Sequence, residues 1–240
     1  MNLILLFPDD FVDDRRVRLT GRRREHVMRV HRAAVGDALI VGVEGGRIGG
    51  GEITRLDDDA LEMIVTVNED PPPPLALTLV LALPRPKVLN RVIAGATSLG
   101  VKRIYLINAW RVEKSYWKSP RMSEENLLAQ RILGLEQARD TTLPAIEVRR
   151  LFRPFVEEEL PFIANESLAR DSLALVAHPN AVAECPRHVE RPVTLAIGPE
   201  GGFIDREIAS LEGIGFTPVA LGPRILRVET VVAALLGRLF

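Results

Sequence analysis

Four consecutive prolines, Pro71 to Pro74, are the feature of this sequence that most restricts its fold. Proline fixes φ and has no amide hydrogen, so a run of four favours a stiff polyproline II spacer and cannot continue a helix or a sheet ladder. A chain of 240 residues is also long enough for two compact units. We therefore predict one domain over residues 1–72 and a second over residues 73–240.

The segment before the prolines has the pattern of a small β-barrel. Short apolar stretches separated by glycine and aspartate predict strands over residues 38–43, 49–55 and 61–68, and the apolar run of residues 3–7 predicts an N-terminal strand. One helix is expected over residues 21–30. The first domain should therefore be mainly β.

After the prolines, apolar runs alternate with amphipathic segments of helical length, which is typical of a parallel sheet covered by helices. The predicted strands are residues 75–83, 103–108, 145–151, 172–178, 193–198 and 217–222. The predicted helices are residues 87–99, 123–139, 205–214 and 229–239. The fold class predicted for this domain is α/β.

Arginines are concentrated between residues 15 and 32, although the formal net charge of the whole chain is only −1. This segment holds eight arginines and a single acid, Glu25. Such a density of positive charge suits a polyanion such as a nucleic acid. The alternative is a solvated arginine-rich face that only improves solubility, for which mixed charges would serve better.

Cysteine and histidine give no sign of a metal site. Cys185 is the only cysteine, and the four histidines, His26, His31, His178 and His188, lack the spacing of zinc ligands. The N-terminal apolar run is too short for a signal peptide or a membrane span. We expect a cytoplasmic protein without metal and without a membrane segment.

Two glycine-containing segments follow predicted parallel strands, Leu195 to Gly202 and Leu221 to Thr230. Ligands of open α/β sheets bind at the carboxyl ends of the strands, and glycine there lets the backbone approach a ligand closely. This placement favours a nucleotide-like cofactor. The alternative is that these glycines only make tight strand-to-helix turns.

The fingerprint of a dinucleotide-binding enzyme is missing from the second domain. Such enzymes have G-x-G-x-x-G directly after the first strand, with an acid about twenty residues later. This chain instead continues from its first predicted strand into Leu83-Pro84-Arg85-Pro86-Lys87. An oxidoreductase that uses a nicotinamide cofactor is therefore a weak alternative.

The two glycine-containing segments carry a resemblance to a known family. Gly198-Pro-Glu-Gly-Gly202, followed about twenty residues later by Leu221-Gly-Pro-Arg-Ile-Leu-Arg-Val-Glu-Thr230, resembles the RsmE family of 16S ribosomal RNA uridine-N3 methyltransferases. The resemblance extends to the N-terminal domain, where His26, the segment Val30-His31-Arg32 and the pair Gly36-Asp37 are similar to the RNA-binding domain of that family.

The resemblance implies a fold that residue patterns alone do not predict. It implies a PUA-like β-barrel at the N-terminus and a SPOUT α/β domain whose deep trefoil knot forms the pocket for S-adenosylmethionine. It also implies a homodimer, and a function in methylating the N3 position of a uridine in ribosomal RNA of the small subunit. Without the resemblance, the rarity of knots would predict an unknotted sheet.

The motifs also assign roles to particular residues. The residues of these motifs expected to bind S-adenosylmethionine are Gly198, Glu200, Gly201, Leu221, Gly222, Ile225 and Leu226. His178, which ends another predicted strand at the same edge, is expected to form a further wall of the pocket, unless it is only structural. Arg224 and Arg227 are expected to stabilise negative charge on the uridine, and Glu229 is the candidate proton acceptor, unless it only pairs with an arginine or caps the last helix. The residues expected to contact RNA are Arg22, Arg23, Arg24, Arg29, Arg32, Arg85 and Lys87.

Two further features leave alternatives open. The family has Gly-Arg between its Glu-Gln pair and a proline, whereas this chain has Arg139-Asp140 at those two positions. The departure indicates a divergent branch of the family. It also keeps open the alternative of a non-catalytic RNA-binding or ribosome-assembly protein with the same fold.

Trp110, Tyr116 and Trp117 lie in a basic stretch and could stack an exposed base, although packing in a core or an interface would explain them equally well.

Overall fold

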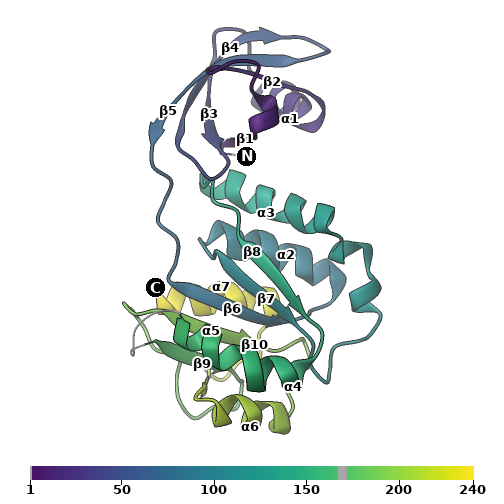
Figure 1. Cartoon of the computed structure of the whole chain (residues 1–240), viewed down its shortest axis with the longest axis vertical. Coiled ribbons are helices and arrows are strands. Elements are labelled where there is room, and N and C mark those ends of the chain that lie inside the picture. The colour runs from purple at the N-terminus through teal and green to yellow at the C-terminus, as the bar shows by residue number, and fades with distance from the viewer. Residues whose placement is uncertain (1, 167–171) are drawn as a thin grey trace. The chain divides into compact units, whose positions relative to one another are not determined.

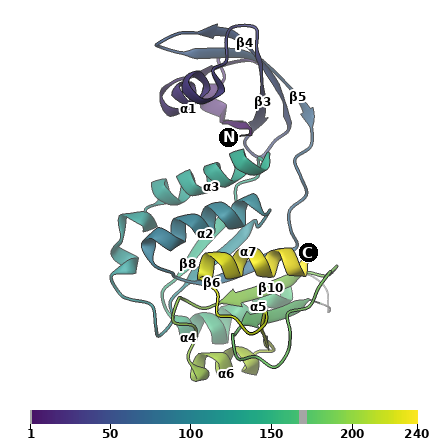
Figure 2. The ribbon, with the colours of Figure 1, turned by 180° about the vertical axis from the view of Figure 1, so that it is seen from behind.

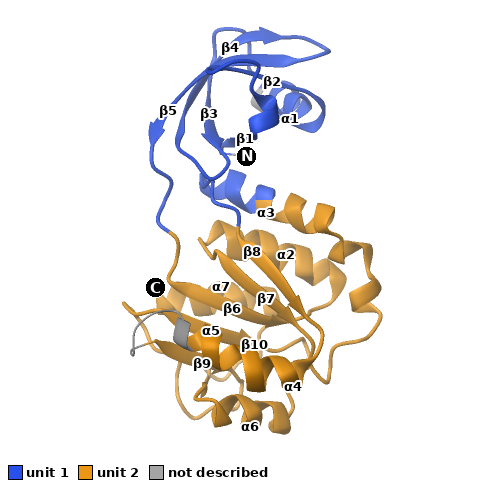
Figure 3. Ribbon diagram, viewed as in Figure 1, with its two compact units in different colours: residues 1–73, 132–143 blue, residues 74–131, 144–240 orange. Residues whose placement is uncertain are grey.

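The computed structural model describes residues 2–166 and 172–240, and the chain divides into two compact units (Figure 3). The first unit, blue in Figure 3, contains residues up to Pro73 together with Ile132–Leu143. The second unit contains Pro74–Arg131 and Pro144–Phe240. The proline run therefore lies where the chain leaves the first unit, whereas residues 132–143 belong to a unit in which the sequence did not place them.

The first unit is built on a five-stranded sheet in the order β1-β3-β4-β5-β2. Its strands are β1 (Ile4–Leu6), β2 (Arg16–Leu19), β3 (Ala38–Val43), β4 (Ile48–Leu56) and β5 (Leu61–Glu69). The pair β1 and β3 is parallel and the other pairs are antiparallel. The four strands predicted for this domain are confirmed, and β2 was not predicted.

Strand β2 lies inside the arginine-rich segment. Val17 and Leu19 are fully buried, while Arg16 and Arg18, which alternate with them, are exposed. The alternation is therefore that of an amphipathic strand, but four residues are too few for the period to stand out among so many arginines. The segment continues into α1 (Gly21–His26) and a π-helical turn, η2 (Val27–His31), which together confirm the predicted helix.

Residues 132–143 complete the core of the first unit. Leu135 is fully buried and packs in one cluster with Leu3, Leu5 and Ile48. The amide of Gly45 donates to the carbonyl oxygen of Thr141 over 2.8 Å. Because these contacts join residues about 90 to 130 positions apart, no local pattern could have predicted them.

The second unit is a six-stranded, fully parallel sheet in the order β11-β9-β10-β6-β7-β8. Its strands are β6 (Leu77–Ala82), β7 (Arg103–Ile107), β8 (Ala145–Arg149), β9 (Leu173–Ala177), β10 (Val193–Ile197) and β11 (Thr217–Val219). All six predicted strands are confirmed. The central strands β6 and β10 are buried along their whole length, which explains their unbroken apolar sequence.

Helices lie on both faces of this sheet (Figures 1 and 2). The helices are α2 (Pro86–Ser98), α3 (Glu124–Ala138), α4 (Phe152–Pro154), α5 (Leu160–Glu166), α6 (Asp205–Gly213) and α7 (Val228–Leu239). A π-helical turn, η5 (Phe155–Glu159), joins α4 to α5. Short 3-10 turns are η3 (Tyr116–Lys118) and η4 (Pro120–Met122) in this unit and η1 (Pro8–Asp10) in the first. Figure 1 shows α4, α5 and α6 on one face, and Figure 2 shows α2 and α7 on the other. The four predicted helices are confirmed, whereas α4, η5 and α5 were not predicted.

Three neighbouring strands end at the same level and so define one edge of the sheet. Ala177 at the end of β9 is in register with Ile197 of β10 and with Val219 of β11. The chain segments that follow these strands therefore start side by side. Across the described residues, 2–166 and 172–240, no helix is long and apolar enough to span a membrane.

Candidate active site

A cavity of about 240 Å³ lies at this edge, beyond the ends of β9, β10 and β11 and beside α7. Its lining includes all eight residues that the sequence assigned to cofactor binding: His178, Gly198, Glu200, Gly201, Leu221, Gly222, Ile225 and Leu226. They come from three loops far apart in the chain. The structure therefore brings the predicted set together in one place, and their role in binding a cofactor stays a prediction.

Glycine is required at two positions in the walls of this cavity. A Cβ on Gly198 would lie 2.8 Å from the amide nitrogen of Phe203 and 3.1 Å from the Cα of Gly202, so there is no room for a side chain. Gly222 has a φ of +121°, which side-chain-bearing residues rarely adopt. The two motifs thus contain glycine where the backbone of the loop requires it.

Contacts from neighbouring loops hold the walls in place. A carboxylate oxygen of Glu200 accepts a hydrogen bond of 2.9 Å from the amide of Arg85, the residue before α2. Arg111, from the loop after β7, donates to the carbonyl oxygen of Gly201. The amide of His178 donates to the carbonyl oxygen of Val219 over 3.0 Å, which ties the end of β9 to the end of β11. Arg111 was not among the predicted site residues.

The three residues predicted to take part in the chemistry lie at different distances from the cavity. Arg224 is exposed and belongs to its lining, whereas Arg227 and Glu229 do not. Arg227 precedes α7, and Glu229 in the first turn of α7 pairs with Arg91 of α2 over 3.1 Å. Of the two arginines, Arg224 is therefore the one placed to act on a ligand in the cavity.

The predicted RNA-contacting arginines of α1 differ in what they already bind. Arg23 forms two hydrogen bonds of 2.6 Å with the carboxylate of buried Asp10 and donates to the carbonyl oxygen of Leu5. Arg24 donates to the carbonyl oxygen of Asp57 over 2.8 Å. Both arginines are thus engaged within the first unit, and the bidentate pair of Arg23 with a buried carboxylate fixes the geometry of both groups.

The other predicted RNA-contacting residues point to solvent. Arg22, Arg29 and Arg32 are exposed in the first unit, and Arg85 and Lys87 are exposed at the start of α2 in the second. Arg22 also lies 3.7 Å from a carboxylate oxygen of Glu136. The structure thus divides the predicted set into a structural pair and an exposed group.

The divergent pair Arg139-Asp140 forms the turn that ends α3. Arg139 has a φ of +55°, and the amide of Asp140 donates to the carbonyl oxygen of Leu135 over 3.1 Å. This is the bonding pattern of a Schellman turn, in which glycine is the favoured residue at the position of positive φ. Asp140 is only 3% exposed, and its carboxylate accepts from the amide of Thr142. Both departures therefore lie in a turn of the first unit, and Asp140 is not presented to a ligand.

Replacing Arg139 with glycine is expected to stabilise the protein. Glycine relieves the cost of a left-handed conformation, which is about 1 kcal/mol for a residue with a side chain, and should raise Tm by roughly 2–4 °C in a thermal unfolding experiment. Arg139→Ala is the matched control, because it removes the guanidinium but keeps the Cβ. Equal stabilisation by both variants would show that the charge of Arg139, and not its backbone conformation, is the source of the effect.

Glu136, in the last turn of α3, is a buried carboxylate in the first unit. Its side chain is 1% exposed, and neither oxygen has a hydrogen-bond partner of normal geometry among the described residues. Burial raises the pKa of Glu136 above its ordinary value of 4.5, while the nearby charge of Arg22 and the amide of Leu5 lower it in part. A carboxyl with a raised folded pKa makes the protein less stable as pH rises from 4.5 through that folded value.

We expect Glu136→Gln to increase the free energy of unfolding near neutral pH, because the amide keeps the shape of the side chain without the charge. The gain should be mostly lost at about pH 4, where the glutamate is protonated in the folded state and mostly protonated in the unfolded chain. Urea unfolding at about pH 4 and at about pH 7 measures it. Arg22→Ala should deepen the pH dependence of the wild-type chain, and a pH-independent effect of Glu136→Gln would contradict this explanation.

A second cavity, of about 660 Å³, lies in the second unit and was not predicted from the sequence. Its walls come from the loop after β7, from α4 and η5, and from the start of α6. Trp110, one of the three aromatic residues noted in the basic stretch, belongs to this lining and is 80% exposed. Among the residues that the structure describes, no group of three or more histidine, cysteine, aspartate or glutamate side chains could hold a metal ion.

Comparison with known proteins agrees with this geometry. Residues 71–239 match the model of the RNA methyltransferase domain family. The fold is similar to that of a ribosomal RNA small subunit methyltransferase E from Neisseria gonorrhoeae solved with bound S-adenosyl methionine, with a TM-score of 0.74 and 21% identity over 98% of this chain and 95% of that one. A methyltransferase of Legionella pneumophila, solved in complex with the same cofactor, has a TM-score of 0.72 and 25% identity over 98% and 96% of the two chains.

Relatives of known function cover almost the whole chain. A ribosomal RNA small subunit methyltransferase E from Synechocystis is 30% identical over 93% of this chain and 72% of its own length. The protein of the same name from Treponema pallidum is 28% identical over 98% and 88% of the two chains. The resemblance found in the sequence motifs is thus confirmed, and this chain belongs to the ribosomal RNA small subunit methyltransferase E family.

Proposed function

We propose that this chain, as an S-adenosylmethionine-dependent methyltransferase of ribosomal RNA, methylates N3 of a uridine in the 16S rRNA of the small subunit. The observation that carries the proposal is the cavity at the strand ends, where seven motif residues, His178 and Arg224 meet. The family to which the chain belongs accounts for the reaction class. The uridine and its N3 atom come from the motif resemblance.

The residues around the cavity fit S-adenosylmethionine. Gly198, Gly201 and Gly222 line the cavity and have no side chains of their own, so an adenosine can approach their backbone closely. Val219, Leu221 and Leu235 offer apolar surface for the flat face of an adenine. A mostly apolar cavity with a few backbone polar groups is typical of a cofactor site.

The chain's own residues would then act by position and charge. When bound, S-adenosylmethionine supplies an electrophilic methyl group, and much of the acceleration in such a transfer comes from holding two reactants in line. Loss of the proton from uridine N3 leaves negative charge on the neighbouring carbonyl oxygens, which the guanidinium of Arg224 is placed to stabilise. Glu229 lies outside the cavity lining and is paired with Arg91, so it is less well placed to accept that proton.

Three further elements of the proposal concern assembly and fold. The first unit forms a PUA-like barrel, which is supported by the fact that both edge strands, β1 and β2, contribute to one buried core. The second unit is knotted, which is supported by contacts of α7 with the segment after β9: Val189 donates to the carbonyl oxygen of Leu239, and Arg238 pairs with Glu184. The chain forms a homodimer, which is supported by the exposed apolar side chain of Ile225 beside the cavity.

Purified protein, labelled S-adenosylmethionine and small ribosomal subunits from a strain that lacks this protein provide the test. We expect label to enter 16S rRNA and to be recovered as 3-methyluridine. Because small subunits are assembled in the cytoplasm, the proposal also places the protein there. If the protein binds S-adenosylhomocysteine but transfers no methyl group to naked RNA or to subunits, the proposed enzymatic activity is contradicted. That result would favour a non-catalytic RNA-binding protein of the same fold.

RNA binding by the first unit should depend on its exposed arginines. The double replacement of Arg29 and Arg32 by alanine is expected to weaken rRNA binding and to reduce the magnitude of the slope of log K against log salt by roughly 1–2. The slope falls because fewer phosphates are neutralised, so fewer counterions are released on binding. Filter binding over a range of salt concentrations measures this slope. Arg55→Ala is the matched control, since Arg55 is already paired with Asp57 and Glu62. An equal change in both variants would contradict the assignment.

A further inference from the structure

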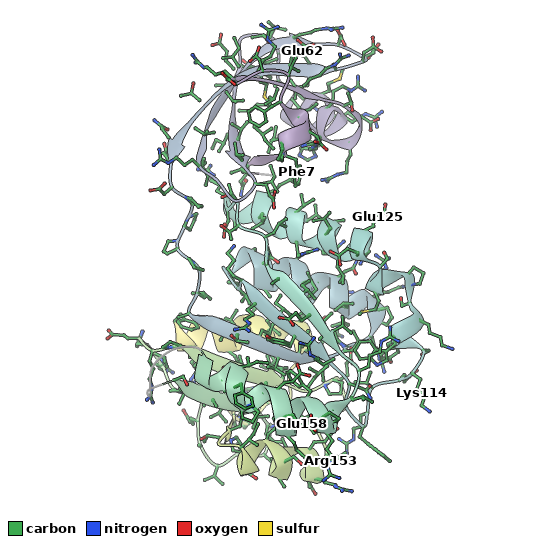
Figure 4. All side chains as sticks on the ribbon, viewed as in Figure 1. Phe7, Glu62, Lys114, Glu125, Arg153 and Glu158 are labelled. Carbon is green, nitrogen blue, oxygen red and sulfur yellow. The ribbon has the colours of Figure 1, made fainter. Side chains whose placement is uncertain are left out.

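The second cavity of the methyltransferase unit has the features of a nucleotide subsite. It is formed by three separate segments, residues 108–114 after β7, residues 152–157 of α4 and η5, and residues 204–210 at the start of α6. Its polar lining includes Lys114 and Arg153, which are labelled in Figure 4 and come from two of these segments. None of its residues belongs to the cofactor cavity.

Trp110 is held by its backbone while its ring stays in solvent. The amide of Trp110 donates to one carboxylate oxygen of Glu207 over 2.7 Å, and the other oxygen accepts from the amide of Ile204 over 3.0 Å. Glu207 is buried, so this link fixes the loop against α6. The indole is nevertheless 80% exposed. An exposed aromatic ring on an anchored backbone is a platform on which single-stranded RNA bases stack.

The charges around the ring suit a phosphate. Lys114 and Arg206 are exposed in the lining, together with Arg153, whose guanidinium pairs with Glu157 over 2.7 Å. Both oxygens of Glu207 are already engaged by backbone amides. A phosphate on this surface would therefore meet two exposed cations beside the aromatic ring, the combination found in single-strand binding grooves.

The loop between β10 and α6 connects the two cavities. Gly201 and Gly202 line the cofactor cavity, while Ile204 and Arg206 line the second. Arg111, next to Trp110, donates to the carbonyl oxygen of Gly201 and thus bridges the two loops. The two cavities are therefore linked through the loop after β10 and through the side chain of Arg111.

We propose that the second cavity binds a nucleotide adjoining the target uridine, with its base stacked on Trp110 and its phosphate beside Lys114 and Arg206. The proposal rests on the function proposed above, because it assumes that RNA reaches the cofactor cavity. It makes the methyltransferase unit itself a reader of single-stranded RNA. A base in a duplex cannot reach the ring without unpairing.

The first test measures binding of a uridine pentanucleotide to the full chain carrying Trp117→Phe, so that Trp110 is the only tryptophan. We expect the RNA to quench the fluorescence of Trp110, and a duplex of the same length to do so much more weakly. In the chain that keeps Trp117, Trp110→Ala should weaken pentanucleotide binding about 5- to 100-fold, while Trp110→Phe should retain most of the affinity. Phe162→Ala, which removes another exposed aromatic ring, is the matched control.

Two readouts separate this proposal from the function on which it rests. Affinity for S-adenosylhomocysteine should be the same in Trp110→Ala and the wild type, and KM for the RNA should rise more than kcat falls. Methyl transfer by the wild type together with unchanged RNA affinity in Trp110→Ala would overturn the subsite and leave the function standing. Failure of the wild type to transfer methyl groups would instead reject the function, while quenching of Trp110 would still support an RNA site.

Discussion

Replacing Arg224 with alanine is expected to reduce kcat for methyl transfer roughly 100- to 1000-fold, the effect of removing one preorganised group that stabilises developing negative charge. Arg224 is the only one of the three predicted chemical residues in the lining of the cofactor cavity. Affinity for S-adenosylhomocysteine should change little, because the guanidinium is assigned to the uridine and not to the cofactor. Single-turnover methyl transfer with saturating RNA measures the effect directly.

Arg227→Ala is the matched control for this prediction. Arg227 belongs to the same motif and is equally exposed, but it precedes α7 outside the cavity lining. Its replacement should lower kcat far less than that of Arg224. If the two variants lose activity equally, or if Arg224→Ala loses cofactor affinity instead of turnover, then the charge-stabilising role assigned to Arg224 is wrong.

Gly198→Ala should impair cofactor binding, although it adds only one methyl group. That methyl would overlap backbone atoms of Gly202 and Phe203, which cannot move aside as a flexible side chain can. Forcing such a group into a packed site costs about 1–3 kcal/mol, equal to a loss of roughly 5- to 150-fold in affinity if the loop shifts to accommodate it. Calorimetric titration with S-adenosylhomocysteine provides the measurement.

Gly237→Ala separates this effect from a general consequence of removing glycine. Gly237 lies within α7, and nothing is close to the position of an added Cβ. Alanine there should stabilise the helix by about 0.5–1 kcal/mol and leave cofactor affinity unchanged. Unchanged affinity in Gly198→Ala would show that the loop after β10 does not shape the cofactor site.

Local patterns predicted the second unit well because its sheet is parallel and buried. The strands β6 and β10 are continuous apolar runs, and the intervening helices have clear helical spacing, so each element is visible in its own sequence. The site followed from the same pattern, since the motifs at residues 195–202 and 221–230 come directly after strands. Parallel strands end at a common edge, which brought these motifs together in one cavity.

Other features depend on contacts between distant residues and were therefore not predicted. The burial of Leu135 in the first unit depends on Leu3 and Leu5, more than 100 positions away. Arg23 was assigned to RNA, but its side chain binds Asp10. An arginine-rich sequence shows how much charge is present, not which of the charges are neutralised within the fold.

Mass spectrometry of nucleosides from 16S rRNA, in a strain that lacks this protein, tests the central claim most directly. We predict that one 3-methyluridine is missing from its small subunits and returns when the wild-type chain is restored, but not when the Arg224→Ala chain is restored. If 3-methyluridine is present in the strain without the protein, the proposed target is wrong.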